Sequence, residues 1–167
     1  LLNTKPITTI FKIDLKVPTG YLYALQKTNF IWLKKEIISG NNSILIYQVP
    51  ISSIKNSSNI ITNIIKTRDS IGNLYIRGTE LDTQMITEEG YSPYLFKLKL
   101  NGKETYETKG TWELKNDFMS GPFVNYAIFD KEHNRVLVLE GFCYSPSKEE
   151  RDLIHELESI IKSVVIL

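Results

Sequence analysis

The segment from Lys109 to Tyr144 constrains the fold of this chain more than any other stretch of its sequence. Apolar and polar residues alternate along it, with turn-forming residues at Gly121-Pro122 and from Asp130 to Asn134. Such alternation is typical of β-strands that bury one face, and Gly, Pro, Asn and Asp favour the turns between strands. We therefore predict three consecutive antiparallel strands that end at Leu114, Phe129 and Tyr144.

Strong turn and helix signals flank this segment. Residues 94–100 alternate again, and Asn101-Gly102 is the strongest short hairpin signal in the chain. Beyond the last strand, Ser147 and Glu150 form a capping box, and an apolar stripe at helical spacing follows. The sequence thus predicts a hairpin before the three strands and a helix over about residues 147–164 after them.

The first half of the chain carries similar strand signals. Alternation predicts strands over residues 10–17, 21–25, 30–38 and 43–49. Gly and Asn tolerate positive φ, so Gly40-Asn41-Asn42 is predicted to be a hairpin turn between the last two of these strands.

A helix is expected next. Isoleucines at a 3.6-residue period predict it over about residues 58–72, with Ser58 as its cap and Gly72 near its end. Residues 77–92 show no regular pattern and are expected to form a loop or crossing segment.

The two halves, about residues 8–75 and 92–167, present strands, a hairpin turn and a helix in the same order. We predict a pattern-level repeat within one α+β domain spanning residues 1–167. Its antiparallel sheet is built from two strand-rich units, each followed by a helix, about residues 58–72 and 147–164, that packs on the sheet.

Composition argues against several classes of function. Twenty Lys and Arg residues against nineteen Asp and Glu give a net charge of +1, which offers no long-range attraction for nucleic acid. The single cysteine has no internal disulfide partner, and two histidines are too few for a His-based metal site. No apolar run approaches the roughly 20 residues of a membrane span. We expect no nucleic-acid partner, no cofactor, no metal and no direct membrane span.

Seven aromatic residues gather in the second half of the chain. They are Trp112, Phe118, Phe123, Tyr126, Phe129, Phe142 and Tyr144. They would suit a groove for glycans or apolar ligands, since such ligands bind against aromatic walls. The alternative, favoured by the burial habits of these residue types, is that most rings lie in a core with Trp112 as a packing anchor.

The corner from Asp117 to Pro122 has two interpretations. As a functional loop, it would present an acid and a hydroxyl beside a tight turn. As a structural corner, it would use Gly121 for an unusual backbone angle and Pro122 to end strand pairing, and turn chemistry favours this. Asp117, Phe118, Met119, Gly121 and Pro122, together with Trp112, stay candidates for a ligand or partner surface.

Arg77 and Glu88 belong to a second candidate surface, the polar tract from Arg77 to Glu89. Glu80, Asp82 and Glu89 lie in the same tract. Paired carboxylates serve glycoside hydrolysis, and clustered ones bind Ca²⁺, but the tract has no EF-hand spacing. A solvated acidic loop is the favoured interpretation.

Cys143 lies in an apolar strand. A catalytic thiol needs a base, and neither histidine has a visible reason to be near it. A buried, inert thiol is therefore the expected state.

Several short motifs resemble an envelope lipoprotein family of Bacteroidota, domain of unknown function 4837, in its C-terminal part. The matching residues are Arg68-Asp69-Ser70, Met85-x-Thr87-Glu88, Gly110-x-Trp112, Asp117 to Phe123 without Ser120, and Glu140 to Pro146 without Cys143 and Ser145. Lys109 and Ser120 depart from the family pattern, where Arg and Gly are usual. The resemblance implies a bacterial cell-envelope location and a lipid anchor on an upstream segment that this chain lacks. It implies no activity.

The chain carries no P-loop, dinucleotide fingerprint, zinc pattern or nucleophile elbow. Our first hypothesis is a non-enzymatic domain of a cell-envelope lipoprotein that acts by protein–protein contact or as a scaffold, with an envelope protein as its partner. The second is a small-ligand or glycan-binding domain, which requires an exposed Trp112 or Tyr126. The third is a carboxylate-dependent hydrolase, in which Asp117, Glu88 or Glu140 would face one cleft.

Overall fold

The computed structural model describes residues 1–38, 40–78, 83–88, 92–145 and 150–167. Its helices and short helical turns are α1 (Lys5–Phe11), η1 (Ile51–Ser53), α2 (Ile60–Tyr75), η2 (Lys131–His133) and α3 (Glu150–Lys162). Its strands are β1 (Ile13–Asp14), β2 (Leu22–Lys27), β3 (Phe30–Ile37), β4 (Gly40–Val49), β5 (Met85–Thr87), β6 (Tyr94–Leu100), β7 (Lys103–Leu114), β8 (Ser120–Asp130), β9 (Arg135–Tyr144) and β10 (Val165–Ile166). No helix among these residues is long and apolar enough to cross a membrane.

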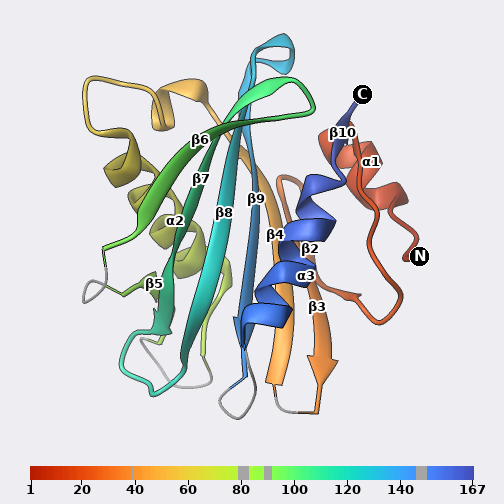
Figure 1. Ribbon diagram of the computed structural model, residues 1–167, viewed down its shortest axis with the longest axis vertical. Coiled ribbons are helices and arrows are strands. Elements are labelled where there is room, and N and C mark those ends of the chain that lie inside the picture. The colour runs from red at the N-terminus through yellow and green to blue at the C-terminus, as the bar shows by residue number, and fades with distance from the viewer. Residues whose placement is uncertain (39, 79–82, 89–91, 146–149) are drawn as a thin grey trace.

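One eight-stranded antiparallel sheet dominates the structure (Figure 1). The strand order is β2-β3-β4-β9-β8-β7-β5, and β6 pairs with the same side of β7 as β5 does. This confirms the predicted α+β class, the antiparallel sheet and the three strands of the second half. Asn101 and Gly102 both have positive φ, 50° and 75°, as the predicted hairpin turn requires.

The two long helices cover opposite faces of the sheet, which is visible in Figure 1 with α3 in front and α2 behind. Ile44, Ile46 and Leu139 face α3, whereas their strand neighbours Leu45 and Val138 face α2. Strands β4, β8 and β9 therefore bury both faces and read as nearly continuous apolar runs. At Gly141, a Cβ would lie only 2.8 Å from the Cβ of Leu157, so a glycine lets α3 approach β9 closely.

The predicted internal repeat is not confirmed. The strand order places β4 and β9 side by side and antiparallel, with β3 and β8 outside them. A two-fold axis relating two such units would have to run normal to the sheet, and would leave both helices on one face. Because α2 and α3 lie on opposite faces, that rotation does not superpose the halves.

The strand predicted over residues 10–17 is wrong in its first part. Lys5–Phe11 is the helix α1, with Pro6 in its first turn, where the missing N–H costs nothing. Lys12 ends the helix in the left-handed conformation, with φ at 58°. Beyond it, Ile13, Leu15 and Val17 are alternately buried as predicted, but only Ile13 and Asp14 pair, with β10.

The hairpin turn predicted at Gly40-Asn41-Asn42 is also wrong, because all three residues are part of β4. Gly40 pairs with Ile37, so the reversal lies earlier, where Ile38 is a turn residue; residue 39 is outside the described ranges. Asn42 is fully buried, and its amide donates to Glu156 on α3 over 3.1 Å. A buried asparagine in a covered strand looks like a turn residue in the sequence.

The predicted helix over residues 58–72 is confirmed with shifted ends. Its cap is Asn59, whose side chain accepts from the backbone N–H groups of Ile61 and Thr62. Gly72 lies inside the helix, where a Cβ would meet the Met85 carbonyl oxygen at 2.2 Å. The glycine therefore serves close packing of α2 against β5 and does not end the helix.

Residues 77–92, predicted as a loop, contain β5 and an isolated bridge between Arg77 and Gln84. The helix predicted over 147–164 is confirmed as Glu150–Lys162. Its predicted cap, Ser147, lies outside the described residues, as does Pro146.

Candidate functional site

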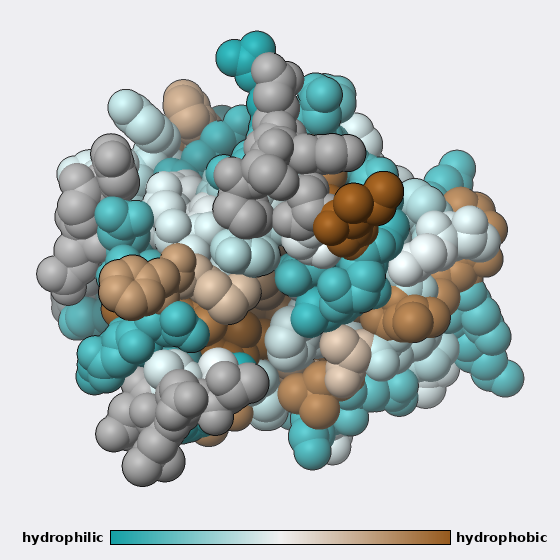
Figure 2. All heavy atoms as spheres, turned by 90° about the horizontal axis from the view of Figure 1, so that it is seen from below, coloured by the Kyte–Doolittle hydropathy of each residue, from teal (hydrophilic) through white to brown (hydrophobic). Residues whose placement is uncertain are grey.

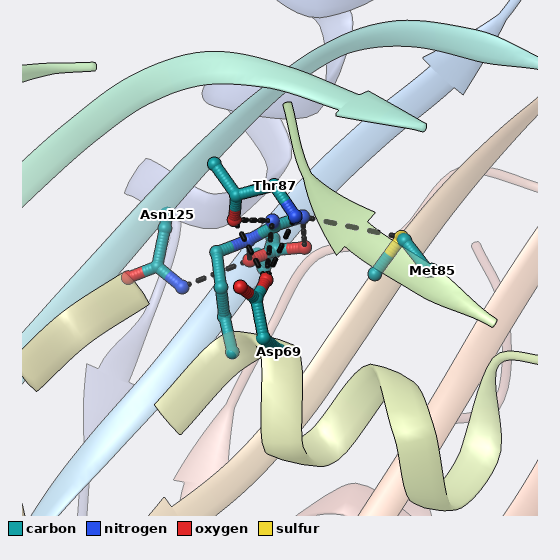
Figure 3. A network of polar contacts seen from close by, with 6 residues as sticks. Asp69, Met85, Thr87 and Asn125 are labelled. Carbon is teal, nitrogen blue, oxygen red and sulfur yellow. Dashed lines mark hydrogen bonds and ion pairs between the residues drawn. The ribbon is translucent and has the colours of Figure 1, made fainter. Parts of the chain in front are cut away.

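An enclosed ion pair fastens α2 to the sheet (Figure 3). Arg68 on α2 donates to both carboxylate oxygens of Glu140 on β9, over 2.8 Å from Nε and 3.0 Å from Nη2. Both side chains are 1% exposed. The guanidinium also lies 3.7 Å from the centre of the Phe123 ring, a cation–π contact. Two parallel hydrogen bonds and a ring face hold the arginine in one geometry.

Neighbouring side chains complete this network. Asp69 accepts from the backbone N–H and the hydroxyl of Thr87 on β5, each over 2.8 Å, and Arg68 Nη1 also contacts that hydroxyl oxygen. Asn125 on β8 donates to Glu140 over 2.9 Å. Burial raises the pKa of Asp69, against the bonds from Thr87 that lower it. The network joins α2, β5, β8 and β9, and its central Arg68–Glu140 pair is enclosed, so we assign it a structural role.

This fastening fixes the C-terminal end of α2 beside a pocket of about 270 Å³ at one end of the sheet. The pocket is lined by Trp32, Lys34, Asn41, Ile76, Arg77, Gly78, Trp112, Leu114, Asp117, Met119, Phe142 and Tyr144. Figure 2 looks onto this end of the molecule, where hydrophobic side chains surround a hollow. The walls are mainly apolar, and Lys34, Arg77 and Asp117 supply charge.

Two large hydrophobic side chains lie fully exposed at the same end. Ile38 follows β3 at the β3–β4 turn, and Phe118 lies in the turn between β7 and β8. Neighbours of both turns, Lys34 and Asn41 on one side and Asp117 and Met119 on the other, line the pocket. We call the pocket together with Ile38 and Phe118 the turn-end surface.

The structure divides the sequence-predicted site residues between two places. Arg77, Trp112, Asp117 and Met119 line the pocket of the turn-end surface, with Phe118 beside it. Glu88, Gly121 and Pro122 instead line an open cavity of about 650 Å³ with Glu150 and Arg151 of α3. Glu80, Asp82 and Glu89 lie outside the described residues.

Trp112 is a packing anchor, as the favoured interpretation predicts. Its ring is edge-on to Phe142, and its Nε1 donates to the Cys143 carbonyl oxygen over 3.0 Å. Gly121 on the intervening strand makes room for this bond, since a Cβ there would lie 2.1 Å from the same oxygen. Within the corner from Asp117 to Pro122, Gly121 is therefore structural, by close approach and not by an unusual φ. The prediction that Pro122 ends strand pairing is wrong, because Pro122 lies opposite Thr111 within β8.

The hypothesis of an aromatic ligand groove required an exposed Trp112 or Tyr126, and neither ring is exposed. Trp112 is 3% exposed and Tyr126 is fully buried, and the Tyr126 hydroxyl donates to Glu107 over 2.5 Å. Phe118 is the exception among the seven predicted aromatics, because it is fully exposed.

The carboxylates proposed for hydrolysis do not converge. Glu140 is paired with Arg68 in the core, Asp117 lies at the turn-end surface, and Glu88 lines the other cavity. Burial raises the pKa of the Cys143 thiol to about 12, and the neighbouring Glu150 carboxylate adds to the rise. Cys143 is thus the buried thiol that the sequence predicts.

Trp32, Lys34 and Ile38 of the turn-end surface were not predicted as site residues. Ile38 does carry a sequence signal, because it is an apolar residue directly before the Ser39-Gly40 break in the alternation. Trp32 and Lys34 carry no such sequence signal, because their position at the pocket depends on how β3 pairs with β4.

The fold places the chain among proteins with the Mog1 architecture. The crystal structure of the Saccharomyces cerevisiae Ran-binding protein Mog1p matches 92% of this chain and 89% of that chain, with 11% identity and a TM-score of 0.54. A mutant of protein Mog1 matches 92% and 90%, with 10% identity and a TM-score of 0.51. At these identities the likeness is one of fold. A search of curated proteins found no match.

The chain belongs to the family described as "Domain of unknown function (DUF4837)", whose model matches residues 1–163. This confirms the domain that the sequence motifs resemble.

Proposed function

We propose that this chain is a non-enzymatic protein-interaction domain that binds a partner through its turn-end surface. The observation that carries this proposal is the full exposure of Ile38 and Phe118 on two turns beside an apolar pocket. Exposed apolar side chains around a pocket rimmed by polar residues are typical of a surface that meets a partner.

The chemistry of this surface suits a protein partner. An exposed aromatic ring beside a pocket resembles the anchor-and-pocket arrangement of interface hot spots. Burying a side chain such as Phe118 contributes about 1.5–3 kcal/mol. Lys34 and Arg77 at the pocket favour a partner segment that carries acidic residues next to its apolar anchor.

The shared fold supports this role only by analogy, because the Mog1p structure is that of a Ran-binding protein. We further propose that the domain belongs to a bacterial cell-envelope lipoprotein anchored by an upstream segment. The support for this location is the motif resemblance. Fractionation of native cells tests it, and recovery of the full-length protein in the cytoplasm would contradict it.

Co-purification tests the interaction itself. The full-length protein is mildly crosslinked in native cells, and the adducts are compared among wild type, Ile38→Ala with Phe118→Ala, and the matched control Val165→Ala. Val165 is an exposed apolar residue at the opposite end of the molecule (Figure 1). We expect the double variant to lose a discrete adduct that the control keeps. Recovery of wild type as a lone monomer, or an adduct unaffected by the double variant, counts against the proposal.

A small apolar ligand is the second candidate, because the pocket joins Trp112 to Lys34, Arg77 and Asp117. The near-complete burial of Trp112 weighs against it. Fragment screening by NMR separates the two, since a ligand site predicts shifts confined to pocket residues without a protein adduct.

A further inference from the structure

Strand β6 is an edge of the sheet. It pairs with β7 from Tyr94↔Lys109 to Leu100↔Lys103 without interruption, and no described residue pairs with its outer side. In Figure 1 it lies at the margin of the sheet. Such an edge presents alternate backbone N–H and C=O groups without ladder partners, a template for another strand.

The two faces of β6 carry different side chains. Tyr94 and Phe96 point to the α3 face and are 71% and 52% exposed. Lys97 and Lys99 point to the α2 face and are exposed as well. An added strand would therefore meet aromatic rings on one face and two lysines on the other.

The edge is held in a fixed shape. The Asn101-Gly102 turn sets its register with β7, and Asn101 Oδ1 accepts from the backbone N–H of Ile166 over 2.9 Å. The opposite edge, β2, has an irregularity in register between Tyr23 and Leu25, which disturbs a template for pairing. Of the two edges, β6 is the regular one.

From this geometry we propose that β6 binds an extended partner segment in which apolar and acidic residues alternate, by adding it to the sheet as a strand. The apolar residues lie beside Tyr94 and Phe96, and the acidic residues lie beside Lys97 and Lys99. A second copy of this chain is a poor occupant, because antiparallel pairing of two β6 strands centred on Leu98 sets Lys97 against Lys99. This site is separate from the turn-end surface and shares no residue with it.

The test uses three short synthetic peptides and the isotope-labelled protein. In the first peptide valine and glutamate alternate, in the second valine and lysine alternate, and the third repeats the first with alternate backbone nitrogens methylated. NMR titration gives the affinity, and amide hydrogen exchange locates the bound strand. Sedimentation reports self-association.

The glutamate peptide is expected to bind at least about tenfold more tightly than the lysine peptide, because two attractive cross-strand pairs replace two repulsive ones. It slows amide exchange within β6, and the methylated peptide does not bind because it cannot pair. The variant Lys97→Glu with Lys99→Glu reverses the preference. The control Lys16→Glu with Lys27→Glu changes net charge equally at exposed residues, with Lys27 on the opposite edge strand β2, and keeps the preference.

Absence of binding overturns the proposal, as does equal binding of the methylated peptide, which would show charge attraction without strand pairing. A preference that follows net charge in both double variants, or protection outside β6, also overturns it. Dimerisation of the free protein through β6 would identify the second copy as the occupant and refute the acidic segment.

Discussion

Arg68 and Glu140, far apart in the sequence, meet at 2.8 Å between α2 and the central strand β9. Neither side chain reaches solvent, so each charge depends on the other for its solvation. Through Asp69 and Thr87 the same contact holds β5, which borders the pocket end of α2. The polar network thus shapes the turn-end surface without belonging to it.

Replacing either partner of this pair should destabilise the fold strongly. Arg68→Met or Glu140→Gln is expected to cost about 3–5 kcal/mol, since each leaves an uncompensated buried group. The double variant should cost clearly less than the sum of the two, because the second change removes no further pairing. Urea unfolding of all four proteins measures the coupling, and additive costs would contradict the account of a mutually dependent pair.

Gly121 should not accept even a methyl group. The added carbon in Gly121→Ala would meet the Cys143 carbonyl oxygen at 2.1 Å and the Trp112 Nε1 at 2.9 Å. We expect a loss of about 1–3 kcal/mol, typical of overpacking, and a fluorescence change as the indole bond lengthens. Ser120→Ala, at an exposed position of the same strand, is the control. Equal stability of the two variants would show that β8 can shift away from the Cys143 carbonyl and the Trp112 ring at little cost in free energy.

Asp130 should contribute a stability that depends on pH. Burial alone would raise its pKa, but the hydrogen bonds and charges of Arg135 and His133 together hold it below the usual value. The unfolded carboxyl, with a pKa of about 3.9, then takes up its proton first. The contribution is therefore complete above that pH and is lost as pH falls through the folded-state pKa.

The check is the unfolding free energy of wild type and Asp130→Asn between about pH 6 and pH 3, where an unfolded carboxyl titrates. We expect the variant to be weaker at the upper end and to lose less stability on acidification. Parallel curves for the two proteins would mean that Asp130 does not cause the acid sensitivity.

Cys143 should react with thiol reagents only when the protein unfolds. Its pKa of about 12 leaves almost no thiolate at neutral pH, and its side chain is enclosed. Alkylation monitored by mass spectrometry along a urea series is expected to follow the global unfolding curve. Fast modification in the absence of denaturant would instead indicate local opening near the start of α3.

Local patterns in the sequence predict the second half of the fold well. The turn at Asn101-Gly102 and the alternation through β7, β8 and β9 report backbone conformation directly, so those strands are found close to their true ends. In the first half, local patterns predict the wrong structure at positions where tertiary contacts determine the conformation. Asn42 has the sequence signal of a turn residue, but it lies in a strand and donates to Glu156 on α3. Gly72 has the signal of a helix end, but it lies inside α2, where Met85 packs closely against it.

The candidate site was predictable only in part. Arg77, Asp117 and Met119 do meet at one pocket, although their proximity depends on β5 pairing with β7. The sequence does not show which face of the sheet each helix covers, and Trp112 is buried on the face that α2 covers. Phe118 is exposed because it lies in the turn between β7 and β8. The motifs that carry the family resemblance therefore contain more residues that pack within the fold than residues of the turn-end surface.

Exposure of Phe118 makes it a clean position for testing the turn-end surface. It makes no packing contribution that its removal would take away, so Phe118→Ala should change the unfolding free energy by no more than about 0.5 kcal/mol. Loss of binding in this variant then reports the interface and not the fold. Thermal unfolding of the purified variant checks that condition.

The most direct test of the interaction surface is photo-crosslinking from position 118 in the full-length protein in its native cells. A photoreactive phenylalanine analogue replaces Phe118 in one sample and Val165, at the opposite end, in another. The account predicts one discrete adduct from position 118, abolished by Ile38→Ala, and no such adduct from position 165. No adduct from position 118, or the same adducts from both positions, would contradict it.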